Sequence, residues 1–427
     1  MPERQGLLRV IRRWDLVALA VNTIIGAGIF GLPAEVFKRV GVYSLFAFVA
    51  CALVVVLMVL CFAEVSSRFT GTGGPYIYAR EAFGPVAGFE VGWLLWIARL
   101  TAFAANLNLF VSYLAFFWPG ASSGAGRIVV ILLVIGALTA LNLTGVRNAT
   151  SASNVFTVAK LLPLLLLIGA GMFVIQGDSY TLPAWPGIGD FSIAVLLLVF
   201  AFSGFELATI AGGEARNPRG DIPKALLIAI AIVAVCYILI QFVVVGTLPA
   251  DALAASARPL ADAGSRILGP WGGGLISAGA LVSIGGNLLV IILVAPRLLF
   301  AMSERRELPE WVGAVHPRFR TPHAAILVTS SVMLVLALTG TFVYAATISV
   351  IARLLAYGST CAALPVLRRK KTAPEAAFHT PGGDVLAVLS VVVAGYLLSR
   401  TTLAQARDGA IAVAIGLIVY WLGKRKP

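Results

Sequence analysis

Twelve long apolar segments follow one another along this chain, and they restrict its fold more than any other feature. Each has 17 or more residues, close to the ~20 that a helix needs to cross the hydrocarbon core of a membrane. Of the 427 residues, 59% are hydrophobic and 12% are charged, whereas a soluble domain has roughly 25% charged residues. The sequence therefore predicts an all-α integral membrane protein, a single domain over residues 1–427 with twelve transmembrane helices. The apolar segments lie at residues 15–38, 43–66, 88–117, 127–146, 153–175, 191–213, 223–247, 272–303, 323–341, 343–367, 383–400 and 407–423.

The basic residues are divided unevenly between the connections, and this predicts the orientation of the chain in the membrane. The formal net charge is +13, from 32 lysines and arginines against 19 acidic residues. With the N-terminus inside, 21 basic residues fall in cytoplasmic segments, seven fall outside and four fall within apolar segments. Cytoplasmic loops carry the excess of lysine and arginine in membrane proteins. We therefore expect both termini in the cytoplasm, in a bacterial or archaeal plasma membrane, and no nucleic-acid surface.

The cysteines do not predict a disulfide framework or a metal site. All four, Cys51, Cys61, Cys236 and Cys361, fall within apolar segments, where cysteine behaves as a small buried hydrophobic residue. We expect no metal, no cofactor and no obligate protein partner. The partners that the sequence predicts are the lipid bilayer and a small molecule.

Two apolar segments, the first and the sixth, are interrupted by glycine at corresponding places in the two halves of the chain. Residues 24–30 read IIGAGIF and residues 200–206 read FAFSGFE. Unwound helix inside a membrane exposes polar backbone groups at a cost of several kcal/mol, unless protein or a polar cavity satisfies them. A pair of such breaks, one in each half, indicates the midplane binding site of a secondary transporter built from inverted repeats.

Three groups of residues resemble the motifs of the amino acid-polyamine-organocation superfamily. Any one of them is weak alone, but their order and spacing together are specific, and the resemblance covers nearly the whole chain. The matching residues are 24–30 (IIGAGIF), 63–69 (AEVSSRF) with 73–76 (GGPY) and 82–84 (AFG), and 213–218 (GEARNP) with 221–225 (DIPKA).

This resemblance implies a fold and a class of function. The fold is a LeuT-like core of two inverted repeats, residues 15–175 (spans one to five) and 191–367 (spans six to ten), with two peripheral spans in residues 383–423. In this fold the first and sixth helices are broken. Members of the superfamily move amino acids or related amines as proton-coupled importers, exchangers or facilitators.

The breaks themselves predict how a zwitterion binds. The helix that restarts after Gly26 and Gly28 presents amide N–H groups at its positive end, which suits a carboxylate, and freed carbonyls at residues 200–203 accept from an ammonium. The resemblance implies binding positions at both breaks. They are Ile24, Ala27 and Gly28 for the carboxylate and Phe200, Ala201 and Ser203 for the amino group. Ala27 stands where relatives carry a serine, which leaves only backbone donors there.

Two aromatic residues beside the sixth-span break have two interpretations. Phe202 and Phe205 resemble the aromatic positions that cover the substrate in the superfamily. As apolar residues of a transmembrane segment they equally suit packing. Glycines in transmembrane helices likewise often serve only close helix packing, although the pairing of the two breaks disfavours that reading here.

Lys160 lies about seven residues into the fifth span, or ~10 Å along a helix axis at 1.5 Å per residue. The resemblance implies that its ammonium takes the place of the ion in sodium-coupled relatives, against first-span carbonyls and an eighth-span hydroxyl, for which Ser283 is the candidate. Because burial penalises a charged ammonium, such a lysine can exchange a proton during transport. The alternative is that Lys160 extends to the cytoplasmic surface.

Charged residues near the middle of other spans are also candidates for function. Arg99 and Arg353 lie in the third and tenth spans, and Glu206 follows the sixth-span break directly. Three basic groups, these two arginines and Lys160, therefore compete for one central carboxylate. The sequence leaves open whether an Arg-Glu pair is structural or part of a gate, and it makes Glu206 the second candidate for proton coupling.

We expect a secondary active transporter, with proton-coupled and sodium-independent uptake of neutral amino acids by alternating access. Neutral substrates are favoured because central arginines repel a cation. An amino acid or amine exchanger is the alternative within transporters. A membrane-embedded enzyme is disfavoured, since His316, His323 and His379 lie in or beside connections without ligand spacing and no catalytic set is evident. A channel is disfavoured because no ring of charges or carbonyl filter is visible.

Overall fold

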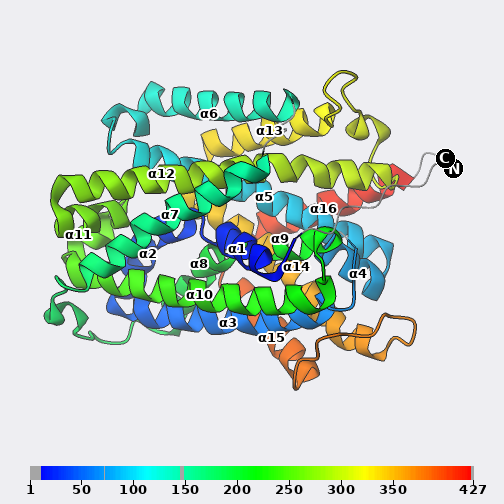
Figure 1. Ribbon diagram of the computed structural model, residues 1–427, viewed down its shortest axis with the longest axis horizontal. Coiled ribbons are helices and arrows are strands. Elements are labelled where there is room, and N and C mark those ends of the chain that lie inside the picture. Colours follow the sequence, from blue (N-terminus) through cyan, green and yellow to red (C-terminus); the bar gives the residue numbers. More distant parts are fainter. Residues whose placement is uncertain (1–10, 72, 145–148, 425–427) are drawn as a thin grey trace.

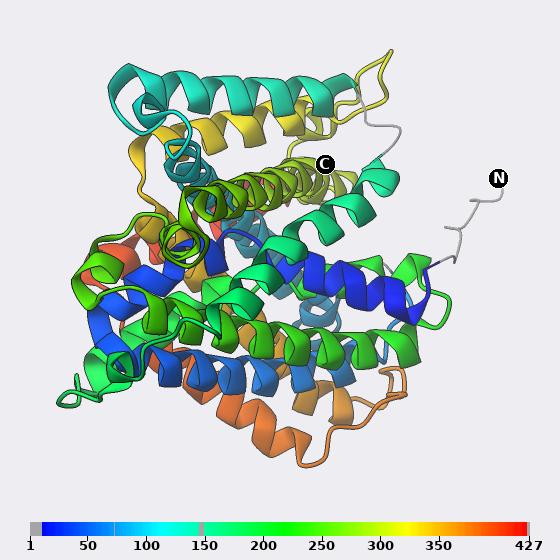
Figure 2. The same ribbon diagram turned by 60° about the vertical axis from the view of Figure 1, so that its left-hand side comes forward.

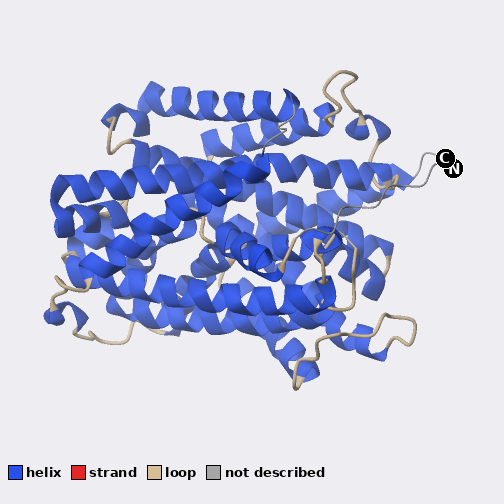
Figure 3. Ribbon diagram, viewed as in Figure 1, coloured by secondary structure: helices blue, strands red, loops and turns tan. Residues whose placement is uncertain are grey.

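A computed structural model describes residues 11–71, 73–144 and 149–424. Within these residues the fold is built from helices alone, as Figure 3 shows, and the only strand-like pairing is one isolated bridge between Ile11 and Ala215. The predicted all-helical class is therefore confirmed. The two chain ends, residues 1–10 and 425–427, lie outside the described residues, so their cytoplasmic location stays a prediction.

Sixteen α-helices form the described fold. In chain order they are α1 (Arg13–Ile24), α2 (Gly28–Val40), α3 (Ser44–Ser66), α4 (Pro75–Phe83), α5 (Pro85–Leu114), α6 (Gly124–Thr144), α7 (Ala149–Gly171), α8 (Ile188–Phe202), α9 (Glu206–Ile210), α10 (Pro218–Thr247), α11 (Ala250–Ala255), α12 (Pro259–Glu304), α13 (His323–Thr339), α14 (Phe342–Arg369), α15 (Gly383–Leu398) and α16 (Leu403–Lys424). Short 3₁₀ helices lie between them at Gly41–Tyr43, Pro119–Ser122, Gly177–Tyr180, Ala211–Glu214 and Glu310–Gly313.

Many of these helices suit a membrane by length and composition. Seven helical stretches of the described chain are long and apolar enough to cross one, and four shorter apolar helices accompany them. The seven are Gly28–Ser66, Pro85–Leu114, Gly124–Thr144, Pro218–Thr247, Pro259–Glu304, Phe342–Arg369 and Leu403–Gly423. The four are Lys160–Gly171, Ile188–Phe202, His323–Thr339 and Gly383–Leu398. The protein is therefore a multi-pass membrane protein, while twelve crossings, the inverted-repeat boundaries and the orientation stay predictions.

Both glycine-containing motifs interrupt a helix. The chain leaves the helical conformation between the end of α1 at Ile24 and the start of α2 at Gly28. It does so again between the end of α8 at Phe202 and the start of α9 at Glu206. Serine and glycine at residues 203 and 204 supply an extended residue and a residue with positive φ there, which no helix accommodates.

The broken helices lie in the middle of the molecule. Figure 1 shows α1, α8 and α9 at the centre, with α12 above them and α10 and α3 below, and the turned view in Figure 2 keeps α1 between the same helices. Around this centre α14 and α12 pack along α5, and α10 packs along α3 and α1. The breaks are therefore enclosed by long helices from both halves of the chain.

Candidate functional site

The two helix breaks pack directly against each other through glycines that leave no room for a side chain. A Cβ atom at Gly28 would lie 2.5 Å from the Cα atom of Ala201. Gly204 has a φ of +116°, which residues with a side chain rarely adopt, and a Cβ atom there would lie 2.5 Å from the carbonyl oxygen of Thr23. Thr23 also donates a hydrogen bond from Oγ1 to the carbonyl oxygen of Gly204 at 3.1 Å. The close approach of the breaks therefore depends on glycine at both positions.

The beginning of α2 presents unpaired amide groups. The N–H groups of Phe30 and Gly31 both donate to the carbonyl oxygen of Ala27, at 3.0 and 3.3 Å. The N–H groups of Gly28 and Ile29 come before these bonds and have no acceptor among the residues that the structure describes. Unpaired N–H groups at the positive end of a helix dipole bind anions. The first turn of α2 can therefore bind a carboxylate.

The end of α8 presents carbonyl groups, some of which already accept a hydrogen bond. Ser203 donates from Oγ to the carbonyl oxygen of Phe200 at 2.8 Å. The hydroxyl of Tyr237, from α10, lies 3.1 Å from the carbonyl oxygen of Ile24 and 3.2 Å from that of Ala201. The backbone N–H of Ser203 also donates to the carbonyl oxygen of Phe200, at 3.4 Å. Because a carbonyl oxygen has two lone pairs, the oxygen of Ala201 can accept a further bond, whereas that of Phe200 already accepts two. An ammonium group can therefore bind at this end.

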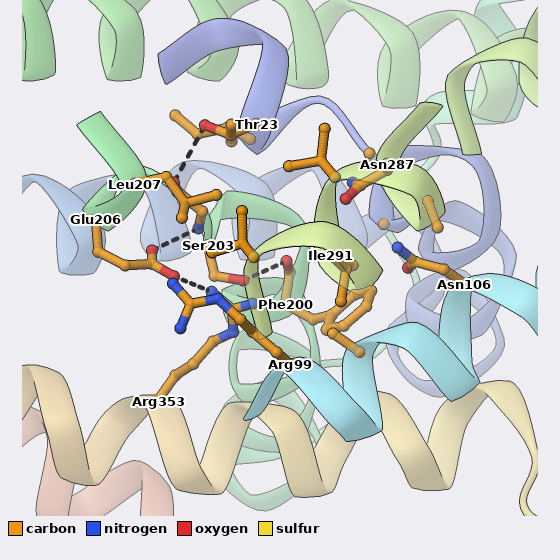
Figure 4. A pocket seen from close by; sticks show the side chains of 18 residues that line it. Thr23, Arg99, Asn106, Phe200, Ser203, Glu206, Leu207, Asn287, Ile291 and Arg353 are labelled. Carbon is orange, nitrogen blue, oxygen red and sulfur yellow. Dashed lines mark hydrogen bonds and ion pairs between the residues drawn. The ribbon is translucent and has the colours of Figure 1, made fainter. Parts of the chain in front are cut away.

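A small cavity separates the two helix ends, and Figure 4 shows the side chains around it. Its free volume is about 40 Å³, which is room for about three water molecules at 10–15 Å³ each. An amino acid can therefore enter only when the residues that line the cavity move apart. Of the positions that the resemblance assigns to a substrate, five line the cavity and Ala201 lies directly behind Gly28. The five are Ile24, Ala27, Gly28, Phe200 and Ser203.

The two aromatic residues beside the second break face protein. Phe202 and Phe205 are fully buried and are not among the residues that line the cavity. The ring of Phe202 meets Tyr237 edge-on at 5.1 Å, and Phe205 packs against Phe62 at 5.1 Å and Tyr357 at 4.9 Å. In this conformation both residues therefore pack in the core, and a covering role stays a prediction.

Glu206 accepts three hydrogen bonds at the second break. Arg353 of α14 donates from Nη1 to Oε1 at 2.7 Å, and the hydroxyl of Tyr357 donates to Oε2 at 2.6 Å. The backbone N–H of Gly204 donates to Oε2 at 3.0 Å. Arg353 is thus the partner of the central carboxylate, and the network joins α14 to the residues between α8 and α9.

Arg99 of α5 lines the same cavity but takes no part in that ion pair. Its side chain is buried, with 3% of the residue exposed, and it forms no ion pair with any described residue. Within the described residues its only hydrogen bond runs from Nη1 to the carbonyl oxygen of Leu95 at 3.5 Å, and its Nη2 atom has no hydrogen-bond partner. Figure 4 shows Arg99 and Arg353 on the same side of the cavity as Glu206, with Asn106 and Asn287 on the other.

Lys160 reaches the first break from α7. Its Nζ atom donates to the carbonyl oxygen of Asn22 at 2.7 Å and to that of Ile25 at 2.9 Å, and 3% of the residue is exposed. The interpretation that it extends to the cytoplasmic surface is therefore wrong. Ser283 is buried in α12, and its hydroxyl has no hydrogen-bond partner among the described residues, Lys160 included.

Sequence reasoning missed four polar residues of the site. Thr23, Asn106 and Asn287 line the cavity, and Tyr237 bridges the two breaks behind it. The amide group of Asn287 lies against the backbone of Gly26, where an added Cβ would be 2.0 Å from Nδ2. Polar side chains within apolar segments are functional candidates in general, so the sequence contained a signal for the two asparagines.

Comparison with known proteins identifies the family. The family model for amino acid permeases matches residues 11–422, nearly the whole chain. The chain belongs to the amino acid permease family. The resemblance that the motifs suggest is thereby confirmed, and the cavity between the breaks is the candidate substrate site of an amino acid permease.

Individual relatives of this permease differ in what their names say they carry. It is 30% identical over 436 residues to the serine/threonine exchanger SteT of Bacillus subtilis, covering 99% of each chain. It is 26% identical over 449 residues to the branched-chain amino acid permease BcaP of the same organism, covering 99% of this chain and 94% of the relative. It is also 27% identical over 441 residues to a methylthioribose transporter of that organism, covering 99% and 95%.

A second cavity of this permease, of about 210 Å³, lies next to the central one. Both are lined by Val294 of α12. At its other side a polar cluster joins α4 to the segment that follows α12: the hydroxyl of Tyr76 donates to Glu307 at 3.0 Å, and Arg80 also pairs with Glu307. Burial and the adjacent Glu307 carboxylate raise the pKa of Tyr76, so its hydroxyl stays a donor. This cluster lies at the end of the bundle that the charge distribution predicts to be cytoplasmic.

Proposed function

We propose that this permease binds a free amino acid between the two helix breaks and carries it across the membrane by alternating access. The α-carboxylate binds at Ile24, Ala27 and Gly28, on the N–H groups of the first turn of α2. The α-ammonium binds at residues 200–203, on the carbonyl of Ala201 and beside Phe200 and Ser203.

One observation carries this proposal. Gly28, whose N–H group has no acceptor among the described residues, and Phe200 and Ser203 at the carbonyl end of α8 line a single cavity, so the polarities at its two sides are opposite. A zwitterion has a negative and a positive group separated by one carbon, and it can satisfy both ends at once. A simple amine, which has donors only, satisfies just one of them.

We further propose that uptake is coupled to protons and independent of sodium. The ammonium of Lys160 binds two carbonyls beside the first break, and this supports its role as a built-in cation that replaces sodium there. Ser283 is the hydroxyl expected to bind the lysine in another conformation. Glu206 is the second candidate for the proton, although its three hydrogen bonds favour a structural role.

We propose neutral amino acids as the main substrates. Arg99 and Arg353 line the cavity against a single carboxylate, and their positive charge disfavours cationic side chains. The names of two relatives, a serine/threonine exchanger and a branched-chain amino acid permease, support this class. The methylthioribose transporter makes a non-amino-acid control advisable.

Exchange is the second candidate mechanism, because the relative at 30% identity is named an exchanger. In exchange, substrate must be bound for the protein to reorient, so counter-substrate inside a vesicle accelerates uptake. In proton-coupled uptake, an inward proton gradient alone drives accumulation. The two mechanisms therefore differ in what must be present inside the vesicle.

The test is uptake into proteoliposomes with a panel of labelled amino acids, amines and methylthioribose. Each compound is measured with and without an inward proton gradient, with and without internal substrate, and in sodium or potassium buffer. We expect neutral amino acids to accumulate with the proton gradient in either buffer. An absolute sodium requirement contradicts the coupling, uptake only against internal substrate selects exchange, and no amino acid uptake at all contradicts the proposed function.

A further inference from the structure

The central cavity has an excess positive charge that no charged group of the described residues balances. Among the described residues, the charged ones that line it are Arg99, Arg353 and Glu206. Arg353 and Glu206 pair with each other at 2.7 Å, which leaves Arg99 as a buried cation without a counter-ion among the described residues. A buried charge is costly unless it is paired and hydrogen-bonded, so this guanidinium is a strong binding group for an anion that enters the cavity.

Neither Glu206 nor Asn106, two polar neighbours in the cavity with acceptor atoms, takes this role in the described structure. The carboxylate of Glu206 already accepts three hydrogen bonds, two from Arg353 and Tyr357 and one from the backbone. Asn106, whose Oδ1 also lacks a partner in the described chain, lies on the same helix as Arg99 and seven residues away. Two helical turns separate the two residues by ~10 Å along the axis, and Figure 4 shows them on different sides of the cavity.

From this geometry we infer that Arg99 forms a second anion subsite, which binds the side-chain carboxylate of an acidic amino acid. The inference rests on the proposed function, because the α-groups must already be held at the two breaks. The permease then carries aspartate or glutamate in addition to neutral amino acids. Arg99 is thus a residue that determines specificity rather than one that binds every substrate.

Two features favour a carboxylate on the side chain over the α-carboxylate common to all substrates. The N–H group of Gly28, a residue that lines the cavity, is the proposed site for the α-carboxylate, so a ligand with two carboxylates satisfies both anion sites of the cavity. In addition, the planar guanidinium group matches a carboxylate through two parallel hydrogen bonds. A hydroxyl or amide side chain offers a single neutral acceptor and leaves the charge of Arg99 uncompensated.

The test compares glutamate with glutamine and aspartate with asparagine, since each pair differs only in a carboxylate against an amide. Binding is measured by displacement of a labelled neutral substrate from purified wild type, Arg99→Gln and Arg99→Lys. In wild type we expect each acid to bind about tenfold or more tightly than its amide, a modest value for a desolvated charge pair. In Arg99→Gln we expect the acids to lose this advantage while the amides stay within about threefold of wild type. Arg99→Lys keeps the positive charge but not the planar guanidinium group, so it should retain part of the preference for acids that Arg99→Gln loses.

Three results overturn the inference. Wild type that binds glutamine as tightly as glutamate has no anion subsite. If Arg99→Gln weakens acids and amides equally, Arg99 binds the α-carboxylate or supports the fold. If the Gln variant does not fold, the wild-type comparison and Arg99→Lys decide alone, and a Lys variant with an unchanged acid preference again contradicts the role of the guanidinium. If wild type takes up no neutral amino acid at all, the proposed function itself fails, which is distinct from a failure of this inference.

Discussion

The ammonium group of Lys160 donates a hydrogen bond to the carbonyl oxygen of Ile25 at 2.9 Å, where α1 has just ended. A second bond, to the carbonyl oxygen of Asn22, has a length of 2.7 Å. Carbonyls at a helix end lack partners within the helix, and hydrocarbon offers none. A side chain from α7 therefore stabilises the first break, and any movement of α7 during transport has to alter these bonds.

The first prediction is that Lys160→Ala separates coupling from binding. We expect it to abolish accumulation driven by a proton gradient and to leave equilibrium binding of a neutral amino acid within about tenfold, because the groups proposed to bind substrate stay in place. The loss of two buried hydrogen bonds should destabilise the protein by about 1–3 kcal/mol. Initial rates with an imposed gradient and binding are measured on the same preparation. Normal accumulation by the variant would exclude Lys160 from coupling and make Glu206 the next candidate.

The second prediction is that Gly28→Val abolishes binding. A Cβ atom there would lie 2.5 Å from the backbone of Ala201, so valine forces the two breaks apart and covers the unpaired N–H groups. The matched control is Gly136→Val in α6, where an added Cβ meets nothing within 4 Å. A scintillation-proximity or thermal-shift assay should show no substrate binding for the first variant and wild-type affinity for the second. Retained affinity in Gly28→Val would falsify the assignment of the carboxylate site.

The third prediction concerns the hydroxyl of Tyr237, which lies within 3.2 Å of carbonyls at both breaks. Tyr237→Phe should lower stability by about 1 kcal/mol and reduce the transport rate, because the bond links two segments that have to move relative to each other. Tyr180→Phe is the control, since it loses a bond to the carbonyl of Phe242 away from the breaks. Equal effects of both variants on transport would show that Tyr237 has only a general stabilising role.

The fourth prediction is that Glu206→Gln destabilises the protein more than removal of the whole ion pair. The single substitution leaves Arg353 buried without a counter-ion, which costs roughly 3–5 kcal/mol, whereas a buried pair replaced by apolar residues costs far less. We therefore expect the double variant Glu206→Gln with Arg353→Met to melt at a higher temperature than Glu206→Gln. Detergent melting curves of the two single variants and the double variant test this. If the melting temperature of the double variant falls by the sum of the decreases in the two single variants, the side chains of Glu206 and Arg353 are not coupled.

The fifth prediction is that Glu307→Gln opens the end of the bundle near Tyr76. It removes the carboxylate that pairs with Arg80 and accepts from Tyr76, and a loss of about 1 kcal/mol shifts an open-closed equilibrium about fivefold. A cysteine placed by Val294→Cys, between the two cavities, reports the opening through its rate of reaction with a water-soluble maleimide. Labelling should become faster in the double variant than with Val294→Cys alone. An unchanged rate would show that the cluster does not limit access.

Local patterns were sufficient for the elements and for the breaks. Apolar length predicts helices because every backbone polar group in hydrocarbon must bond within its own helix, and each predicted apolar segment overlaps helical residues in the described part of the chain, with two α-helices in each of the broken segments 15–38 and 191–213. The glycines at residues 26–28 and 204 predict the interruptions because an unwound segment needs close backbone approach and positive φ. Motif order indicated the family, which the match over residues 11–422 confirmed.

Tertiary structure alone decided which groups meet. The sequence placed Arg99, Arg353 and Lys160 at similar depth beside one carboxylate, because depth follows from 1.5 Å per residue along an axis. The direction in which each side chain points depends on how α5, α7 and α14 pack around the breaks, and those helices are far apart in the chain. Packing pairs Arg353 with Glu206, directs Lys160 to the carbonyls of α1 and leaves Arg99 in the cavity. The hydroxyl that Tyr237 places between the breaks was hidden for the same reason: hydrogen bonds to backbone carbonyls leave no pattern in a sequence of apolar spans.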